Sequence, residues 1–188
     1  SMNNVGRSYG LLGQHRKAIE YHETAIAIIG KAAVGRDHPE LATAFSQLGL
    51  AYGGLEDHKR ALEYHEKALA MRERLFAGRD QQHTAASLYN IGVTHFFLRD
   101  HRKSVESLQR SLSMYQRIFA GRDHPWLASA LNFLGRALDG SGDYPKAIEH
   151  LEKALAMRER IYEGRDHLQT AGTLINLGRA YRLAGQPR

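Results

Sequence analysis

The 188-residue sequence contains no cysteine, no apolar run long enough to cross a membrane and no secretory signal. Without cysteine the chain can form neither a disulfide framework nor a reactive thiolate, and a reducing compartment fits that composition. A membrane-spanning helix needs about 20 predominantly apolar residues, so we expect no membrane contact. Together these absences favour a cytoplasmic location.

The motifs of catalysis and metal binding are also missing. The sequence has no nucleophile motif, no phosphate-binding loop and no convergent pair of acidic residues. It has 11 histidines, but none forms a close pair with a third ligand of the kind that zinc requires. We therefore expect a protein that is not an enzyme and that holds neither a metal nor another cofactor.

Basic residues outnumber acidic ones, 26 to 20, which gives a net charge of +6 and favours acidic partners over basic ones. The two signs are interspersed: Glu63 precedes Lys67 by four residues, and Glu149 precedes Lys153 by the same interval. Such pairs stabilise a helix by only about 0.2–0.5 kcal/mol each. They indicate a solvated helix surface.

The sequence does contain a repeat. A Gly-Arg-Asp segment begins at Gly35, Gly78, Gly121 and Gly164, always 43 residues apart. A fixed period of about 20–50 residues indicates a solenoid, because one unit cannot bury its apolar face alone. We predict one continuous domain over residues 1–188, part of a longer array. It comprises a partial unit (1–34), three full units (35–77, 78–120 and 121–163) and a last partial unit (164–188).

Each full unit should contain two helices. In the first full unit the sequence predicts a helix over Pro39–Gly53, where proline occupies the first turn and loses no hydrogen bond. A second helix should follow over His58–Phe76, with Asp57 placed to cap its first turn. The same pattern predicts nine helices along the chain, the last over Leu168–Ala184.

One apolar stripe repeats on the first helix of every unit. Counting each unit from its Gly-Arg-Asp glycine as position 1, the stripe occupies positions 11, 14, 15 and 18. Position 15 is always glycine, in Gly6, Gly49, Gly92, Gly135 and Gly178. A glycine inside a helix costs about 1 kcal/mol relative to alanine. Its recurrence therefore predicts that a second helix backbone approaches too closely for a Cβ atom. The expected partners are small residues of the second helix: Ala18, Ala61, Ser104 and Ala147, then Ala25, Ala68, Ser111 and Ala154.

In the first full unit the stripe is Phe45, Leu48, Gly49 and Tyr52, followed by Ala61 and Ala68. This pattern resembles the tetratricopeptide repeat, and the longer second helix and connector are similar to the repeats of kinesin light chains and nephrocystins. The resemblance implies an all-α, right-handed superhelical solenoid of antiparallel helix pairs. It also implies a scaffold that binds a protein or peptide in its concave groove. The sequence departs from the pattern at Gln81, Gln82, His95 and Leu168.

Positions 13 and 16 of the first helix point away from the stripe, toward the face that lines the groove in tetratricopeptide arrays. Position 13 is mostly a side-chain amide, which both donates and accepts hydrogen bonds, so a row of amides can hold the backbone of an extended peptide. The row consists of Asn4, Gln47, Asn90, Phe133 and Asn176. The alternative is a set of polar residues on a solvated face.

Position 16 carries Arg7, Arg136 and Arg179. Guanidinium groups along one face would select carboxylates or phosphates, which predicts an acidic partner. The alternative is ordinary solubilising charge.

Two aromatic residues, Phe97 and Phe133, should also face the groove on either side of Asn90. They would form a pocket for one large apolar side chain of the partner, because exposed aromatic residues often anchor an interface. The alternative is that Phe96 and Phe97 pack into the core between units.

We favour a peptide-recognition adaptor over a structural spacer or self-assembling segment and over an RNA-binding helical repeat. The excess of basic residues would suit RNA. However, the Gly-Arg-Asp connector and the Leu-Gly…Tyr stripe are similar to those of the protein-binding family, so we do not expect a nucleic acid partner. The last helix carries its stripe with no second helix to cover it. Either the chain is a fragment of a longer array or this end pairs with a second copy, and the second alternative predicts self-association through this end.

Overall fold

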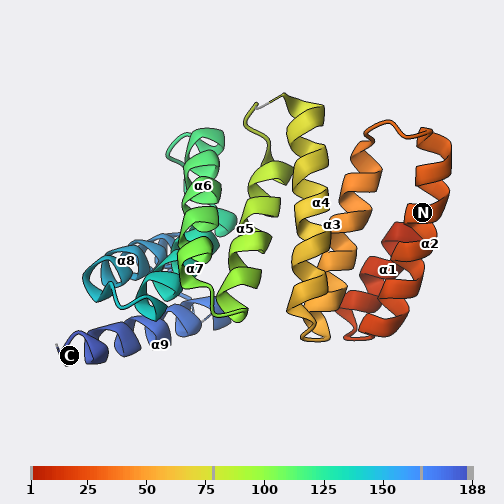
Figure 1. Ribbon diagram of the computed structural model, residues 1–188. Coiled ribbons are helices and arrows are strands. Elements are labelled where there is room, and N and C mark those ends of the chain that lie inside the picture. Colours follow the sequence, from red (N-terminus) through yellow and green to blue (C-terminus); the bar gives the residue numbers. More distant parts are fainter. Residues whose placement is uncertain (1, 78, 166, 186–188) are drawn as a thin grey trace.

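The computed structural model describes residues 2–77, 79–165 and 167–185, and within these residues the chain forms nine helices and no strand. The helices are α1 (Met2–Leu11), α2 (His15–Ala33), α3 (Pro39–Gly54), α4 (His58–Phe76), α5 (Gln82–Phe97), α6 (His101–Phe119), α7 (Pro125–Gly140), α8 (Tyr144–Ile161) and α9 (Leu168–Leu183). The predicted all-α solenoid of antiparallel helix pairs is confirmed, and Figure 1 shows the pairs stacked in chain order. The unit start predicted at Gly78 lies outside the described residues.

The helix ends follow the local sequence. α3 begins at its proline, and the Nδ1 atom of His38 accepts a hydrogen bond from the backbone N–H of Glu40 at 3.2 Å. α4 begins behind Asp57, as predicted, and Asp57 Oδ1 accepts a hydrogen bond from the N–H of Arg60 at 3.1 Å. α3 ends one residue later than predicted and α9 one residue earlier, a difference within the fraying of helix ends.

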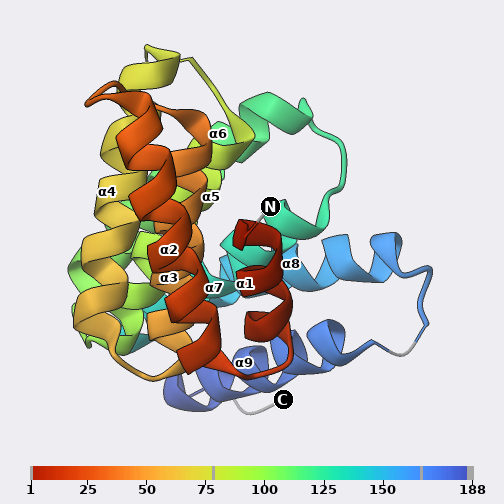
Figure 2. The same cartoon turned by 90° about the vertical axis from the view of Figure 1, so that its right-hand side faces the viewer.

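The curvature of the array gives it an inner and an outer side. The backbones of successive first helices (α1, α3, α5, α7 and α9) approach within 8 Å between Cα atoms, whereas those of successive second helices in the described residues do not. The first helices therefore line the inner side. Figure 1 shows α8 and α9 at the opposite end of the array from α1 and α2, and Figure 2, seen along the array, shows α8 and α9 running in a different direction from α2 and α4. None of the helices in the described ranges is both long and apolar enough to cross a membrane.

The predicted stripe forms the core of the three full units. Leu48, Leu88 and Leu134 are at most 2% exposed, and the small residues of the second helices are buried beside them. In α9 half of the stripe is uncovered: Leu174 is 50% exposed and Gly178 is exposed, because no second helix packs on this side, whereas Leu177 is 2% exposed. Burial of the stripe thus depends on pairing within a unit.

The recurring glycine has a second cause besides the predicted approach of a helix backbone, which is present at Gly135, where a Cβ atom would lie 3.1 Å from the carbonyl oxygen of Ala147. A Cβ atom at Gly49 would lie 2.6 Å from the ring of His65, and one at Gly92 would lie 2.6 Å from Cγ of Leu108. The glycine therefore makes room mainly for a bulky side chain of the second helix. The small residues lie about one helical turn before and one turn after that side chain. We had predicted the small residues as the partners of the glycine but not the large side chain between them.

A bidentate ion pair ties the connector of each full unit to the second helix of the same unit. The guanidinium of Arg74 donates to both carboxylate oxygens of Asp37 at 2.7 and 2.8 Å. The same contact recurs in the pairs Arg117–Asp80 and Arg160–Asp123. The glycines at position 1 that belong to the described residues have a positive φ, for example +74° at Gly35, which favours glycine there. These two features account for the glycine and the aspartate of the Gly-Arg-Asp repeat.

Candidate functional site

The predicted amide row lies along the first helices, and its members differ in their hydrogen bonding. Asn4 is exposed, and Gln47 and Asn90 are half-buried. Within the described residues the side-chain amides of these three have no hydrogen-bond partner, so each retains its full capacity to donate and accept. Asn176 is engaged, since its Nδ2 donates to Oδ1 of Asn132 at 3.1 Å. Free amides are therefore concentrated on α1, α3 and α5.

Arg136 belongs to an aromatic cluster on the same face. Its guanidinium carbon lies 4.5 Å from the ring centroids of both Phe96 and Phe133. Burial, and then the neighbouring charge of Arg179, lowers the pKa of the Arg136 guanidinium. A stacked guanidinium of this kind is stabilised by the ring faces. Arg136 thus covers the rings of Phe96 and Phe133.

The other two arginines of position 16 differ from each other. Arg179 forms an ion pair with Asp139, whose side chain is only 3% exposed. Arg7 is exposed at the opposite end of the array. Whether these arginines select an acidic partner stays a prediction, but Arg179 would first have to release Asp139.

The aromatic residues are arranged differently from the predicted pocket. The ring of Phe96 lies between Phe97 and Phe133 and makes edge contacts with both, at centroid distances of 5.6 and 6.3 Å. Phe96 also packs against the core, as the alternative predicted. Phe97 stacks on His58 of the preceding pair at 5.0 Å and remains 48% exposed. The space between Phe97 and Phe133 is therefore filled.

Two open cavities in one register lie instead between successive first helices farther toward the N-terminus, and a further cavity, lined in part by Asn4, lies between α1, α2 and α3. The α3–α5 pocket has a volume of about 180 Å³ and is lined by Gly49, Leu50, Gly53, His58, His65, Asn90, Val93, Thr94 and Phe97. The α1–α3 pocket, of about 160 Å³, is lined by Arg7, Gly10, Leu11, His15, Ala18, His22, Gln47, Leu50 and Ala51. The two occupy the same register one unit apart. Each contains a member of the amide row, so amides and pockets share one surface.

The α3–α5 pocket has an apolar rim and a polar floor. Leu50 and Phe97 are each 48% exposed at its edge, whereas His65 is 2% exposed. Burial lowers the pKa of His65 to about 4, so its imidazole is neutral at pH 7. Its Nδ1 atom is buried and has no hydrogen-bond partner among the described residues. The pocket therefore offers apolar contact at the rim and an unsatisfied polar atom at depth.

Sequence reasoning missed the two positions that open these pockets. Position 19 is glycine in the units that contribute Gly10 and Gly53 but phenylalanine at Phe96. Position 31 is histidine at His22 and His65. The regular spacing of these histidines is visible in the sequence, but we interpreted them as structural residues of the repeat and not as part of a site. No group of three His, Cys, Asp or Glu residues in the described ranges lies close enough to hold a metal ion.

A curved stack of antiparallel helix pairs, with free amides and side-chain pockets on its inner face, defines a helical-repeat solenoid. The chain belongs to the tetratricopeptide repeat family: the family model of that description matches residues 1–74 and 83–160. This match confirms the resemblance drawn from the apolar stripe. A search of curated proteins finds no match.

Several solved structures share the fold. BtubC (BKLC) from P. vanneervenii has a TM-score of 0.82 and 25% identity, over 98% of this chain and 72% of that one. A kinesin light chain candidate from Podosopora anserina, with nearly identical TPR-like repeats, has a TM-score of 0.80 and 24% identity, over 98% and 85% of the two chains. A Rap protein in complex with competence and sporulation factor has a TM-score of 0.75 and 17% identity, over 98% of this chain and 48% of that one. The chain is thus similar to kinesin-light-chain-type repeats.

Proposed function

We propose that this chain is a non-catalytic protein-interaction scaffold that binds an extended peptide along the inner face of α1, α3 and α5. The observation that carries the proposal is the coincidence of three free amides with two side-chain pockets on one surface. Free amides suit the backbone of an extended chain, because they can satisfy its N–H and C=O groups regardless of sequence. The pockets would supply the sequence preference.

The expected ligand carries an uncharged anchor side chain for the α3–α5 pocket. The apolar rim formed by Leu50 and Phe97 favours an apolar stem, and the neutral imidazole of His65 gives no preference for a carboxylate at depth. Acidic residues elsewhere in the ligand would suit the net charge of +6 and the exposed Arg7. A cytoplasmic location, expected from the composition, stays part of this proposal.

The test begins with a library of random short peptides displayed on phage and selected on the immobilised protein. The best peptide is then measured by fluorescence polarisation against a groove variant, Gln47→Ala with Asn90→Ala. Each lost hydrogen bond costs about 0.5–1.5 kcal/mol, so we expect affinity to fall about tenfold or more.

A matched control removes two amides from the outer surface of α6, in the variant Gln109→Ala with Gln116→Ala. Both residues are exposed, and this variant should bind as the parent does. If the chain were a structural spacer, the phage selection would enrich no peptide. Equal losses in the two variants would also contradict a site on the inner face.

A further inference from the structure

The α1–α3 and α3–α5 pockets repeat one site at consecutive units. Both are lined from positions 16, 19, 24 and 31 of one unit and from positions 13, 16 and 17 of the next. Leu50 belongs to both linings, because it is position 16 of the later unit in the α1–α3 pocket and of the earlier unit in the α3–α5 pocket. The two pockets therefore adjoin, with the side chain of Leu50 between them.

The distance between the pockets follows from the packing of the first helices. α1 approaches α3, and α3 approaches α5, within 8 Å between Cα atoms. The axes of helices in such contact lie about 8–10 Å apart. Because each pocket opens at the same register of one such junction, two ligand side chains that enter them are separated by about the same distance. The amides of Gln47 and Asn90 repeat at this spacing too, one beside each pocket.

This spacing distinguishes between the regular conformations of a peptide. In a β-strand, side chains on one face lie two residues apart, about 7 Å, or four residues apart, about 13 Å. In a polyproline II helix, three residues complete one turn and return a side chain to the same face after about 9 Å. The second conformation matches the pockets. Its backbone has no internal hydrogen bonds, so its carbonyls can accept from free amides, whereas the backbone groups of an α-helix are already paired.

The two pockets differ in charge. Arg7 lines the α1–α3 pocket, and the equivalent residue of the α3–α5 pocket is Leu50. Arg7 is exposed and has no ion-pair partner within the described residues, and α1 contains no acidic residue. A carboxylate at this pocket would therefore complement an unpaired cation. The α3–α5 pocket is lined by no Lys, Arg, Asp or Glu, so it suits an uncharged side chain.

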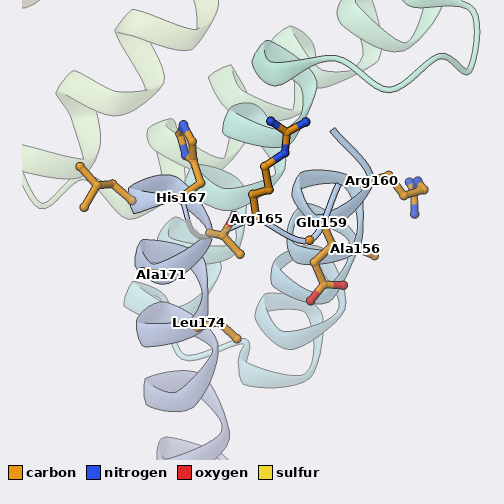
Figure 3. Close-up of a pocket in the computed structure, with 10 residues that line it drawn as sticks. Ala156, Glu159, Arg160, Arg165, His167, Ala171 and Leu174 are labelled. Carbon is orange, nitrogen blue, oxygen red and sulfur yellow. The ribbon is translucent and has the colours of Figure 1, made fainter. Parts of the chain in front are cut away.

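The larger cavity between α8 and α9 does not extend this register. It has a volume of about 860 Å³, and Figure 3 shows it with Ala156 and Glu159 of α8 on one side and Ala171 and Leu174 of α9 on the other. Its lining includes no member of the amide row. The junction of α5 and α7 is filled by Phe96. The register of the ligand is therefore defined at α1, α3 and α5.

We propose that the inner face binds a polyproline II segment with two anchors three residues apart, a large uncharged side chain in the α3–α5 pocket and a carboxylate side chain in the α1–α3 pocket. This inference rests on the proposed function and adds the conformation, the spacing and the charge of the ligand. Arg7 pairs with the acidic anchor, and Leu50 lies between the two anchors. The amides of Gln47 and Asn90 donate to backbone carbonyls of successive turns.

The test compares two phage libraries selected on the immobilised intact chain. One is the library of random peptides. The other presents X-Pro-Pro-Glu and Glu-Pro-Pro-X in proline-rich peptides, where X is any residue, which fixes the spacing and favours polyproline II. We expect the second library to enrich peptides in which X is large and uncharged. Inner-face binders from the random library alone would overturn this inference and leave the proposed function standing, whereas no binder from either library would overturn both.

The best peptide of the second library then supplies a spacing series, measured by fluorescence polarisation. Removing or adding one proline between the anchors turns one anchor away from its pocket by about a third of a turn. Each altered peptide should bind about tenfold more weakly. Equal or tighter binding of either altered peptide would overturn the polyproline II register.

A charge exchange tests the acidic anchor. Arg7→Glu should weaken binding about tenfold, and a peptide with lysine in place of its anchoring glutamate should recover most of that loss. Arg102→Glu, at an exposed site on α6 outside both linings, is the control. It should change affinity less than about twofold in 0.15 M salt, where the Debye length is about 8 Å. Equal losses in the two variants, or no recovery with the lysine peptide, would overturn the pairing with Arg7.

Discussion

At the scale of single residues, positions 19 and 31 decide whether the junction between two first helices is open. Glycine at position 19 and histidine at position 31 give the α3–α5 pocket, through Gly53 and His65. Phenylalanine and leucine at these positions, Phe96 and Leu108, give the filled aromatic junction that follows. The chain therefore contains both an open and a closed form of one site.

The variant Gly53→Phe should convert the open junction into the closed one. A phenyl ring at Gly53 would occupy the pocket as Phe96 occupies the next junction, and we expect the affinity for a selected peptide to fall about tenfold. Gly30→Phe introduces the same side chain on α2, where a Cβ atom meets nothing within 4 Å, and should leave affinity unchanged. Unchanged peptide binding by Gly53→Phe would exclude the pocket from the site.

The buried histidines should make stability depend on pH. Burial lowers the pKa of His22 and His65 to about 4, from 6.5 in the unfolded chain. Between these values the unfolded state binds more protons, so stability is complete above about pH 6.5 and falls as pH decreases toward 4. The loss approaches about 3 kcal/mol for each histidine, at 1.36 kcal/mol per pKa unit.

Urea unfolding at pH 7.5 and pH 5 measures this loss. The double variant His22→Leu with His65→Leu, which copies Leu108 and Leu151 at the same position, should lose clearly less stability between the two pH values. Some dependence should remain, because burial also lowers the pKa of His83, His95, His124 and His150. Identical pH dependence in the variant and its parent would contradict the assignment.

At the scale of helices, the contact within a pair determines what each glycine of the stripe can become. Leu108 packs on Gly92 inside the α5–α6 pair, whereas Gly178 of α9 faces open space. The sequence presents the two glycines as equivalent. Only the presence or absence of a covering helix separates them.

Substitution by alanine should therefore have opposite effects at the two glycines. Gly92→Ala places a Cβ atom 2.6 Å from Leu108 and should destabilise the chain by about 1–3 kcal/mol through overpacking. Gly178→Ala should stabilise it by up to about 1 kcal/mol through helix propensity alone. Urea unfolding followed by circular dichroism measures both. Changes of the same sign would show that packing does not distinguish the two sites.

Helices and core were predictable because they depend on neighbours in the sequence. The stripe, the cap at Asp57 and the helix starts depend on spacings of a few residues, and the period reveals how often they recur. The second cause of the recurring glycine was not predictable in the same way, since it depends on which residue of another helix packs against it.

At the scale of the whole molecule, contacts between units explain why the site was only partly predictable. The amide row follows from spacing along each helix. However, the engagement of Asn176 by Asn132 and of Arg179 by Asp139 joins α9 to α7, and the pockets likewise require two units in their relative positions. These interactions shift the candidate site from the aromatic residues around Phe133 toward the N-terminal half.

The most direct test of the peptide-binding surface is a nuclear magnetic resonance titration of the 15N-labelled chain with the selected peptide. The side-chain amide signals of Gln47 and Asn90 should shift as the peptide is added, whereas those of Gln109 and Gln116 on the outer surface of α6 should not. Shifts confined to the second helices, or a bound peptide that leaves the signals of Gln47 and Asn90 unchanged, would contradict binding along the inner face.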